Sequence, residues 1–302
     1  MNRSRLEGGG GRQPVNRWLP LVAIALWPLL ASTAPPAHGN LGPMEKLLNG
    51  KLAPSPEGSE FVQVREHIVL GYRVTEVVLG RADIDDELPL MVQFHGRGDH
   101  PHIPGGDHAN TEPARLMLPW APAKLGEGFT WFPLSITERD KDPKVLGHYI
   151  RERADEFAKV LEVFQTRRPT EGHALVSGFS QGGMMSFALA LRHPDRIDGA
   201  FPVAGWLPDH LIDESFDPKR PSYPPIRALH GRGDPIVPAE PTMALVDDLR
   251  NRGLDITLEV FSWDEHSMNE EMHARHTELV LELIRGRREG EATPSARPPT
   301  LG

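Results

Sequence analysis

The chain has 302 residues, of which 39% are hydrophobic and 25% are charged, a composition typical of a globular protein. It contains no cysteine, which excludes disulfides, thiolate metal sites and a cysteine nucleophile, so any nucleophilic catalysis must use Ser, Thr, Lys or a carboxylate. The formal net charge of −9 argues against a nucleic-acid partner, because binding to phosphates depends on clustered Lys and Arg.

Residues 1–37 are predicted to be a signal peptide. Four arginines precede an apolar run from Leu19 to Leu30, and small residues follow it, which is the order of a secretory signal. The run is shorter than the roughly 20 residues that cross a bilayer as a helix. We therefore expect cleavage, no stable membrane span afterwards, and export to the periplasm or the exterior. The alternative is an uncleaved N-terminal anchor that tethers the protein to the membrane.

Residues 38–59 are predicted to be a linker, and residues 60–286 a single domain that begins with a β-hairpin. The runs 61–70 and 72–79 are rich in residues that favour strands, and Gly71 between them suits a turn. The hairpin would supply antiparallel strands at one edge of a sheet.

Beyond the hairpin, short apolar segments alternate with longer segments of helical periodicity. The expected strands are 88–94, 129–134, 174–176, 199–203, 226–229 and 256–261, and the expected helices are 145–166, 181–191, 238–252 and 269–285. Strands separated by helices imply a mostly parallel sheet with helices on both faces. The fold class is therefore α/β. Residues 287–302 are predicted to be a disordered tail.

Ser180 is the candidate nucleophile. It lies in the pattern Gly-x-Ser-x-Gly over residues 178–182, after a strand-like segment and before a helical one. A serine at a sharp strand-to-helix turn exposes its hydroxyl, and the flanking glycines leave room for the turn to pack. The following helix points its positive end toward the site.

A serine hydroxyl needs a base to remove its proton, and the base needs an acid to orient it. In an α/β fold with a serine at this kind of turn, the acid follows the serine in the chain and the histidine base follows the acid. Asp234, in the loop after strand 226–229, is the predicted acid, and His266, after strand 256–261, is the predicted base. The rival acids Asp209, Asp213 and Asp217 lie in a proline-rich region and are expected to be solvated. The rival bases His273 and His276 are expected on the surface of the last helix.

Acyl transfer also requires hydrogen-bond donors for the oxyanion of the tetrahedral intermediate. The predicted donors are the backbone N–H groups of Gln181, which follows the nucleophile, and of Arg97, which lies in the turn after strand 88–94. Arg97 belongs to the sequence His-Gly-Arg-Gly-Asp at 95–99, which recurs at 230–234 with Asp234 at its end.

With these motifs, the segment from about residue 88 to 285 resembles the phospholipase/carboxylesterase and acyl-protein thioesterase branch of the α/β-hydrolases. The resemblance implies an α/β-hydrolase fold and a Ser180, Asp234 and His266 triad with oxyanion donors at Arg97 and Gln181. It also implies no cofactor, no metal, and hydrolysis of short- to medium-chain esters or thioesters through an acyl-serine. The substrate would be a small-molecule or lipid-like ester.

Two alternatives belong to other classes of protein. The loop 95–108 contains His95, His100, His102, Asp107 and His108, and imidazole with carboxylate is a zinc-binding set, so a zinc hydrolase is one alternative. The other is a non-catalytic binding protein on a hydrolase scaffold. The sequence leaves the acyl group, the leaving group and the oligomeric state open.

Overall fold

A computed structural model describes residues 51–53, 55–133 and 142–292. The predicted signal segment 1–37 and most of the predicted linker lie outside these ranges. Within them, no helix combines the length and apolar character needed to cross a membrane. The boundaries predicted for the single domain, 60–286, stay a prediction.

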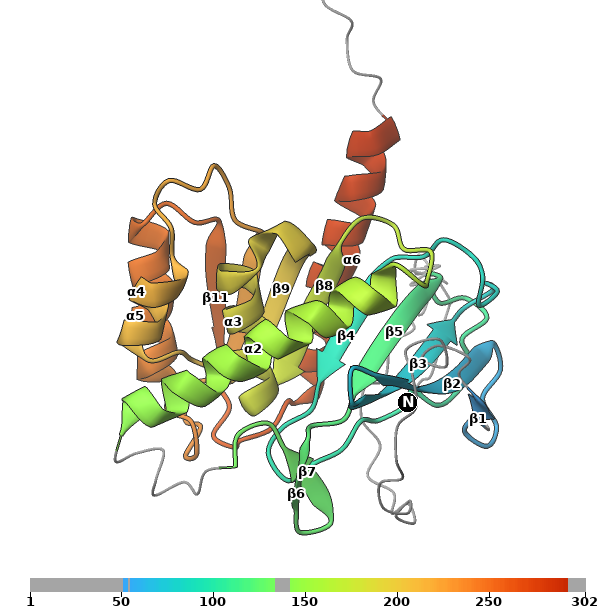
Figure 1. The fold of residues 1–302 in the computed structure, drawn as a ribbon, viewed down its shortest axis with the longest axis horizontal. Helices are drawn as coiled ribbons and strands as arrows, with labels where there is room; N and C mark the ends of the chain where they lie inside the picture. Colours follow the sequence, from blue (N-terminus) through green and yellow to red (C-terminus); the bar gives the residue numbers. More distant parts are fainter. Residues whose placement is uncertain (1–50, 54, 134–141, 293–302) are drawn as a thin grey trace, which may run out of the picture.

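Within the described residues, nine strands form one sheet and two more form a separate hairpin (Figure 1). In chain order the strands are β1 (Lys51–Ala53), β2 (Val62–Val69), β3 (Tyr72–Leu79), β4 (Leu90–Phe94), β5 (Ala114–Pro119), β6 (Ala123–Leu125), β7 (Gly128–Thr130), β8 (Ala174–Phe179), β9 (Ile197–Val203), β10 (Ile226–Gly231) and β11 (Ile256–Phe261). The helices are α2 (Pro143–Gln165), α3 (Gln181–Arg192), the 3₁₀ helix η2 (Pro194–Arg196), α4 (Asp209–Ser215), α5 (Ala239–Asn251) and α6 (Glu270–Ala292).

The large sheet has an antiparallel edge and a parallel body. Its strand order is β1-β2-β3-β5-β4-β8-β9-β10-β11. Strands β1, β2, β3 and β5 pair antiparallel, and from β5 onward every pair is parallel. The tight β2–β3 turn uses positive φ at Leu70 and Gly71 (49° and 87°), as a two-residue hairpin loop requires. The predicted fold class and the antiparallel edge are confirmed.

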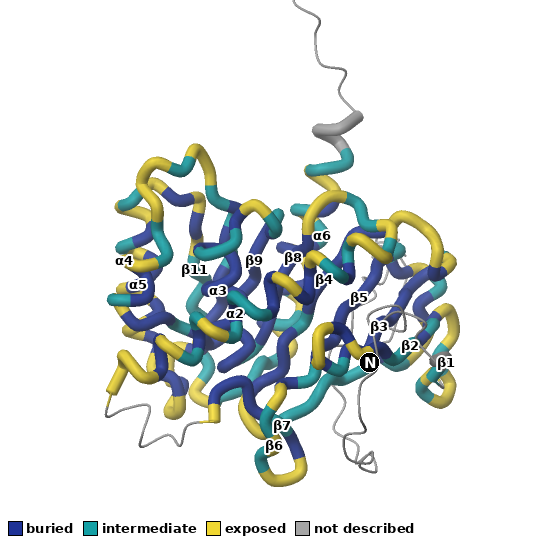
Figure 2. The backbone as a smooth tube through the Cα atoms, viewed as in Figure 1, coloured by how far each residue is buried: buried dark blue, intermediate teal, exposed yellow. Residues whose placement is uncertain are grey.

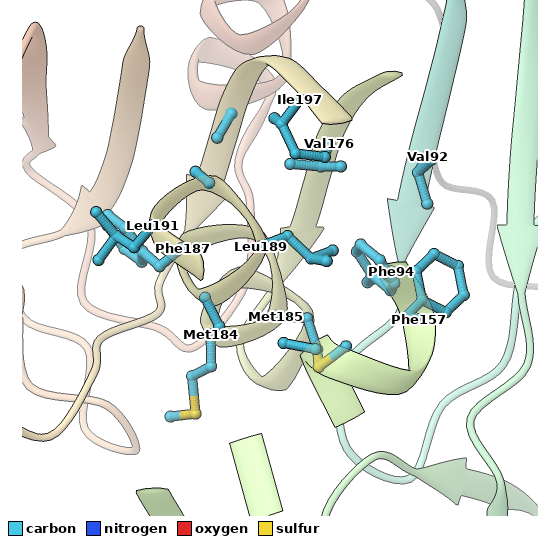
Figure 3. Close-up of a cluster of buried hydrophobic side chains, with 14 of the residues drawn as sticks. Val92, Phe94, Phe157, Val176, Met184, Met185, Phe187, Leu189, Leu191 and Ile197 are labelled. Carbon is cyan, nitrogen blue, oxygen red and sulfur yellow. The ribbon is translucent and has the colours of Figure 1, made fainter. Parts of the chain in front are cut away.

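Helices cover both faces of the sheet, with α2 and α3 on one face and α6 on the other (Figure 1). The larger core cluster packs α2, α3, α4 and α5 against the first face, and it includes the aromatic contact between Phe94 of β4 and Phe157 of α2, with ring centroids 4.8 Å apart (Figure 3). A second cluster packs α6 against the opposite face. The buried strands between these layers (Figure 2) hold the loops at their carboxyl ends in fixed positions.

Strand β5 and helix α4 were not among the expected elements. Strand β5 carries Arg115 between apolar residues, and a charge is an unfavourable signal for a buried strand. The structure buries Arg115 fully because its guanidinium pairs with Glu76 of β3 and donates to the carbonyl oxygens of Ile84 and Asp86 at 2.9 Å. The partners come from other parts of the chain, so the local sequence does not reveal them.

Two elements extend past the predicted ends of the domain. Strand β1 lies inside the predicted linker and pairs with β2. Helix α6 continues to Ala292, past the predicted start of the disordered tail at residue 287. Ion pairs of Arg287 with Asp198 and of Arg288 with Glu171 hold this last part of the helix on the domain.

The expectation for His276 was wrong, because its side chain is buried and not on the surface of α6. It lies on the face of the helix that packs against the sheet, together with Met272, Leu279 and Val280. The hydroxyl of Ser177 donates to the Phe201 carbonyl at 2.9 Å, so the His276 Nε2–H donates to Ser177 Oγ at 2.7 Å. Burial lowers the pKa of His276 to about 4, and the imidazole is neutral at pH 7.

This buried imidazole should make the protein less stable in mild acid. Between the unfolded pKa of 6.5 and the folded pKa of about 4, the unfolded chain binds a proton that the folded chain does not. Stability is therefore fully present above pH 6.5 and falls as the pH drops toward 4. We expect His276 to account for about 2 kcal/mol of the loss in unfolding free energy between pH 7 and pH 4.5.

Urea unfolding of the wild type and of His276→Gln at these two pH values measures the effect. The glutamine amide can donate to Ser177 but does not titrate, so its unfolding free energy should fall less in acid. The exposed His148, replaced by Gln, is the control. Equal acid sensitivity in wild type and His276→Gln would contradict the prediction.

Candidate active site

Ser180 lies at a sharp turn between β8 and α3. Its backbone has φ of 56° and ψ of −113°, a conformation that a residue with a side chain rarely adopts. The Ser180 N–H donates to the carbonyl oxygen of Val203, at the end of β9, at 2.9 Å. The neighbouring strand therefore holds the strained residue in place.

The glycines of the Gly-x-Ser-x-Gly pattern are required by close backbone contacts. A Cβ on Gly182 would lie 2.2 Å from the carbonyl oxygen of Phe94, and a Cβ on Gly178 would lie 2.5 Å from the carbonyl carbon of Gly182. Side chains at these positions would push α3 away from β4 and β8. The glycines thus let the helix begin directly at the serine.

The structure brings Ser180, His266 and Asp234 into one hydrogen-bonded chain. Ser180 Oγ lies 2.9 Å from His266 Nε2, and His266 Nδ1 lies 2.6 Å from Asp234 Oδ2. The Asp234 carboxylate is 1% exposed and the His266 ring 17% exposed. This geometry lets the imidazole take a proton from the hydroxyl while the carboxylate fixes the ring orientation.

The Asp234 carboxylate is held by its own loop. Its Oδ1 accepts hydrogen bonds from the backbone N–H groups of Ile236 and Val237, both at 2.9 Å. This leaves Oδ2 to face His266. The loop is joined to the one that carries His266, because the Gly233 N–H donates to the Trp263 carbonyl at 2.9 Å. The parallel pairing of β10 with β11 brings the two loops together.

The His266 ring rests against Phe179, the residue before the serine. The two ring centroids are 4.6 Å apart and the planes are inclined by 41°. On the other side of the loop, the indole N–H of Trp263 donates to Ser267 Oγ at 3.0 Å. Both contacts restrict the positions that the imidazole can take.

Gln181, one predicted oxyanion donor, directly follows Ser180, and the other, Arg97, lies in a turn that passes close to the serine. Gln181 is the first residue of α3. The turn with Arg97 passes close to the serine, since a Cβ on Gly96 would lie 3.8 Å from Ser180 Cβ. The start of α3 and the turn that carries Arg97 therefore both lie close to Ser180, and the positive end of α3 favours negative charge there.

The small β6–β7 hairpin, part of which was expected as a strand of the main sheet, instead supports this turn. It lies beyond the carboxyl end of β4 (Figure 1). The Gly98 N–H donates to the Phe129 carbonyl at 2.7 Å. The side-chain oxygen of Gln181 accepts from the Thr130 hydroxyl and the Trp131 N–H, both at 3.0 Å. The hairpin and the residue after it thus hold the two segments that carry the predicted oxyanion donors.

His95, which the sequence placed among the candidate zinc-binding residues, instead braces the same turn. Its Nε2 accepts from the Ala121 N–H at 3.1 Å, and its Nδ1–H donates to the Gly96 carbonyl at 2.7 Å. The accepting Nε2 requires a neutral ring. Burial lowers the pKa of His95 to about 4, in agreement with this tautomer.

His230, the matching residue of the second His-Gly-Arg-Gly-Asp sequence, supports the Asp234 loop. Its Nε2–H donates to the Val237 carbonyl at 2.8 Å, and burial lowers its pKa. The repeated sequence therefore marks two turns that are each supported by a buried neutral histidine. The repeated sequence was a signal that these two histidines have similar roles, but it did not show which backbone groups they bind.

The rival acids lie elsewhere. Asp209 and Asp213 belong to α4 and are exposed, and Asp213 pairs with Arg252 at 2.6 Å. Asp217 is also exposed and accepts from the Lys219 N–H at 2.9 Å. None of these three contacts His266 among the interactions of the described residues.

The histidines and aspartates of loop 95–108 do not form one group. His95 binds backbone groups of Gly96 and Ala121 and supports the turn that carries Arg97. His108 is buried and contacts Thr111 Oγ1 and the Gly105 carbonyl, both at 3.2 Å, and Asp107 accepts from the Ala109 N–H at 2.8 Å. Asp99, His100 and His102 do converge, and burial, aided by the charge of His102, lowers the pKa of His100.

The parallel sheet with an antiparallel edge, and the serine at the turn between β8 and α3, place the protein in the α/β-hydrolase class. A family model described as Phospholipase/Carboxylesterase matches residues 81–280. The chain belongs to this family, and the resemblance expected from the sequence is confirmed.

Two individual relatives match smaller parts of this chain than the family model does. The NocK protein of Nocardia uniformis subsp. tsuyamanensis, whose name describes it as an esterase, is 28% identical over 191 residues, or 61% of this chain and 52% of NocK. Acyl-protein thioesterase 1 of Gibberella zeae is 31% identical over 98 residues, covering 31% of this chain and 40% of that protein. The chain thus spans about half or less of these two relatives.

A solved structure supports the fold. The crystal structure of esterase PE8 superimposes with a TM-score of 0.56 at 20% sequence identity, and the match covers 68% of this chain and 99% of that one.

Proposed function

We propose that this protein is a serine hydrolase that cleaves carboxylic esters through an acyl-Ser180 intermediate. The observation that carries the proposal is the hydrogen-bonded chain from Ser180 through His266 to Asp234. Ser180 is the nucleophile, His266 the general base and acid, and Asp234 the residue that orients the imidazole. Membership of the Phospholipase/Carboxylesterase family supports the same reaction class.

In the first half of the reaction, Ser180 Oγ attacks the ester carbonyl carbon while His266 Nε2 takes its proton. The negative charge that develops on the carbonyl oxygen is stabilised by the backbone N–H groups of Gln181 and Arg97. The imidazolium, with its Nδ1–H bonded to Asp234, is stabilised by the carboxylate. His266 then gives the proton to the leaving oxygen, and the alcohol departs from the acyl-serine.

In the second half, water replaces the alcohol. His266 removes a proton from the water as it attacks the acyl carbon, and the second tetrahedral intermediate uses the same donors. When that intermediate collapses, the proton returns to Ser180 Oγ and the carboxylic acid is released. The cycle needs no cofactor.

The proposed substrate is a small-molecule or lipid-like ester. Thioesters are a second candidate class, because matched relatives in Gibberella zeae and Mycosarcoma maydis are named acyl-protein thioesterase 1. The chemistry at Ser180 is the same for both classes, since each has an electrophilic carbonyl and differs only in the leaving atom.

Purified protein tested with p-nitrophenyl esters of increasing chain length and with an acyl-thioester would measure both activity and preference. Covalent labelling by a fluorophosphonate probe, which requires an activated serine, would locate the nucleophile. An absence of both hydrolysis and labelling would refute the proposal and favour a binding protein on this scaffold.

We also infer, from the basic, apolar and small-residue order of residues 1–37, that the protein is exported. Fractionation of producing cells and N-terminal sequencing of the mature chain test this inference. A cytoplasmic protein that retains its first residues would contradict it, and a retained segment in the membrane fraction would favour the anchor alternative.

A further inference from the structure

Three side chains with metal-binding atoms converge on the loop that follows Arg97. Asp99 Oδ1 lies 2.9 Å from His102 Nε2 and 3.7 Å from His100 Nδ1. One ligand atom from each of the three residues can be chosen so that all three atoms lie within 4.8 Å of one another. The imidazole centroids of His100 and His102 are 4.6 Å apart.

These separations are close to those of a tetrahedral zinc site. Zinc binds imidazole nitrogen and carboxylate oxygen at about 2.0–2.2 Å, which places neighbouring ligand atoms about 3.3 Å apart. The three atoms therefore need only small side-chain movements to surround one ion. The ion would displace the hydrogen bond between Asp99 and His102, with the His102 proton on Nδ1. Water would take the fourth position.

Two of the three residues are held in place, Asp99 through its backbone and His100 through contact of its ring with an aromatic residue. Asp99 forms an isolated antiparallel bridge with Phe129, and its carbonyl accepts from the Phe129 N–H at 2.8 Å. The His100 ring stacks on Trp120 at a centroid distance of 6.1 Å. The Trp120 indole N–H in turn donates to Thr75 Oγ1 at 3.1 Å. Supporting contacts of this kind orient metal ligands before the metal arrives.

The cation that packs on Trp120 is itself paired with a carboxylate. The Arg73 guanidinium lies 4.1 Å from the Trp120 ring centroid, but its charge is met by Glu66 at 2.8 Å. The ligand side chains are 22%, 39% and 21% exposed for Asp99, His100 and His102. An ion can therefore enter from solvent.

We propose that Asp99, His100 and His102 form a binding site for a divalent transition metal of the zinc class. Two imidazoles and one carboxylate favour zinc and its neighbours over magnesium or calcium, which prefer oxygen ligands. The site is distinct from the Ser180, His266 and Asp234 chain. It lies two residues from Arg97, so an ion bound there would hold the segment that carries a proposed oxyanion donor. The effect of the ion on the segment with Arg97 rests on the proposed function, whereas zinc binding itself does not.

Calorimetric titration of the full chain with zinc chloride tests the site. The wild type should bind one Zn²⁺ per chain at micromolar zinc, and its Tm should rise by about 5 °C at a zinc concentration 100 times Kd. The His100→Gln and His102→Gln variants should each bind at least about tenfold more weakly. His148→Gln is the matched control, because His148 is an exposed imidazole next to Glu152 at 3.3 Å; its zinc affinity should equal that of the wild type.

A second measurement uses the wild type alone and so does not depend on the folding of a variant. Diethyl pyrocarbonate modifies imidazole nitrogens that it can reach, and peptide mass spectrometry measures the modification of each histidine. Zinc should protect His100 and His102 but leave His148 reactive. Absence of a saturable micromolar site, or equal protection of all three histidines, would overturn the proposal. The same titration on Ser180→Ala should give unchanged binding, so the zinc site can be tested even if the hydrolase proposal fails.

Discussion

Replacement of Ser180 with alanine should abolish hydrolysis of p-nitrophenyl butyrate, with kcat falling by on the order of 10⁵ to 10⁶. Among the residues that the structure describes, Ser180 supplies the hydroxyl next to His266 Nε2, at 2.9 Å. Alanine keeps the Cβ and leaves the turn, the glycine contacts and the Val203 hydrogen bond unchanged. The variant should therefore fold and lose fluorophosphonate labelling.

Circular dichroism and thermal unfolding of Ser180→Ala would show that its fold is intact. Ser222→Ala, which changes an exposed serine, is the control and should keep full activity. Full turnover by a folded Ser180→Ala protein would contradict the assignment of the nucleophile. Turnover that then depended on added zinc would favour the zinc-hydrolase alternative.

The candidate site could be predicted from the sequence because its signals are local. The strained position of Ser180 requires small neighbours on both sides, so the glycines stay close to it in the chain. Asp234 and His266 each follow a strand of the parallel sheet, and the carboxyl ends of such strands meet at one edge. The geometry of the three residues follows from these separate local patterns.

Features that depend on distant partners could not be predicted. Arg115 breaks the apolar pattern of β5, and its burial depends on Glu76 of another strand and on the carbonyl oxygens of Ile84 and Asp86. His276 looks like a surface residue of a helix until Ser177 is placed opposite it. The roles of His95 and His230 depend on Ala121 and Val237, whose backbone groups they bind.

The His-rich loop illustrates the same limit. Sequence proximity grouped His95, His100, His102, Asp107 and His108, whereas the structure brings together Asp99, His100 and His102. The turn at Gly98 and the bridge from Asp99 to Phe129 decide which side chains meet, and Phe129 comes from a hairpin that the sequence placed in the main sheet.

Replacement of Asp234 with asparagine should lower kcat by about 10⁴ with little change in KM. The reason lies in how the loop holds the carboxylate. Ile236 and Val237 both donate to Oδ1, so an asparagine would keep its oxygen there and turn its NH₂ toward His266. That NH₂ donates to Nδ1 and stabilises the tautomer with a proton on Nε2. An imidazole in this form cannot accept the Ser180 proton.

The matched control is Asp209→Asn, which changes an exposed aspartate at the start of α4 and should alter kcat by less than about twofold. Asp234→Asn should remain folded, because the amide oxygen still accepts both loop N–H groups. Rates with p-nitrophenyl butyrate across pH 6 to 9 would measure kcat and KM for both variants. A large loss in Asp209→Asn with near-normal turnover in Asp234→Asn would move the acid to α4, and it would leave the 2.6 Å contact between Asp234 and His266 without a catalytic purpose.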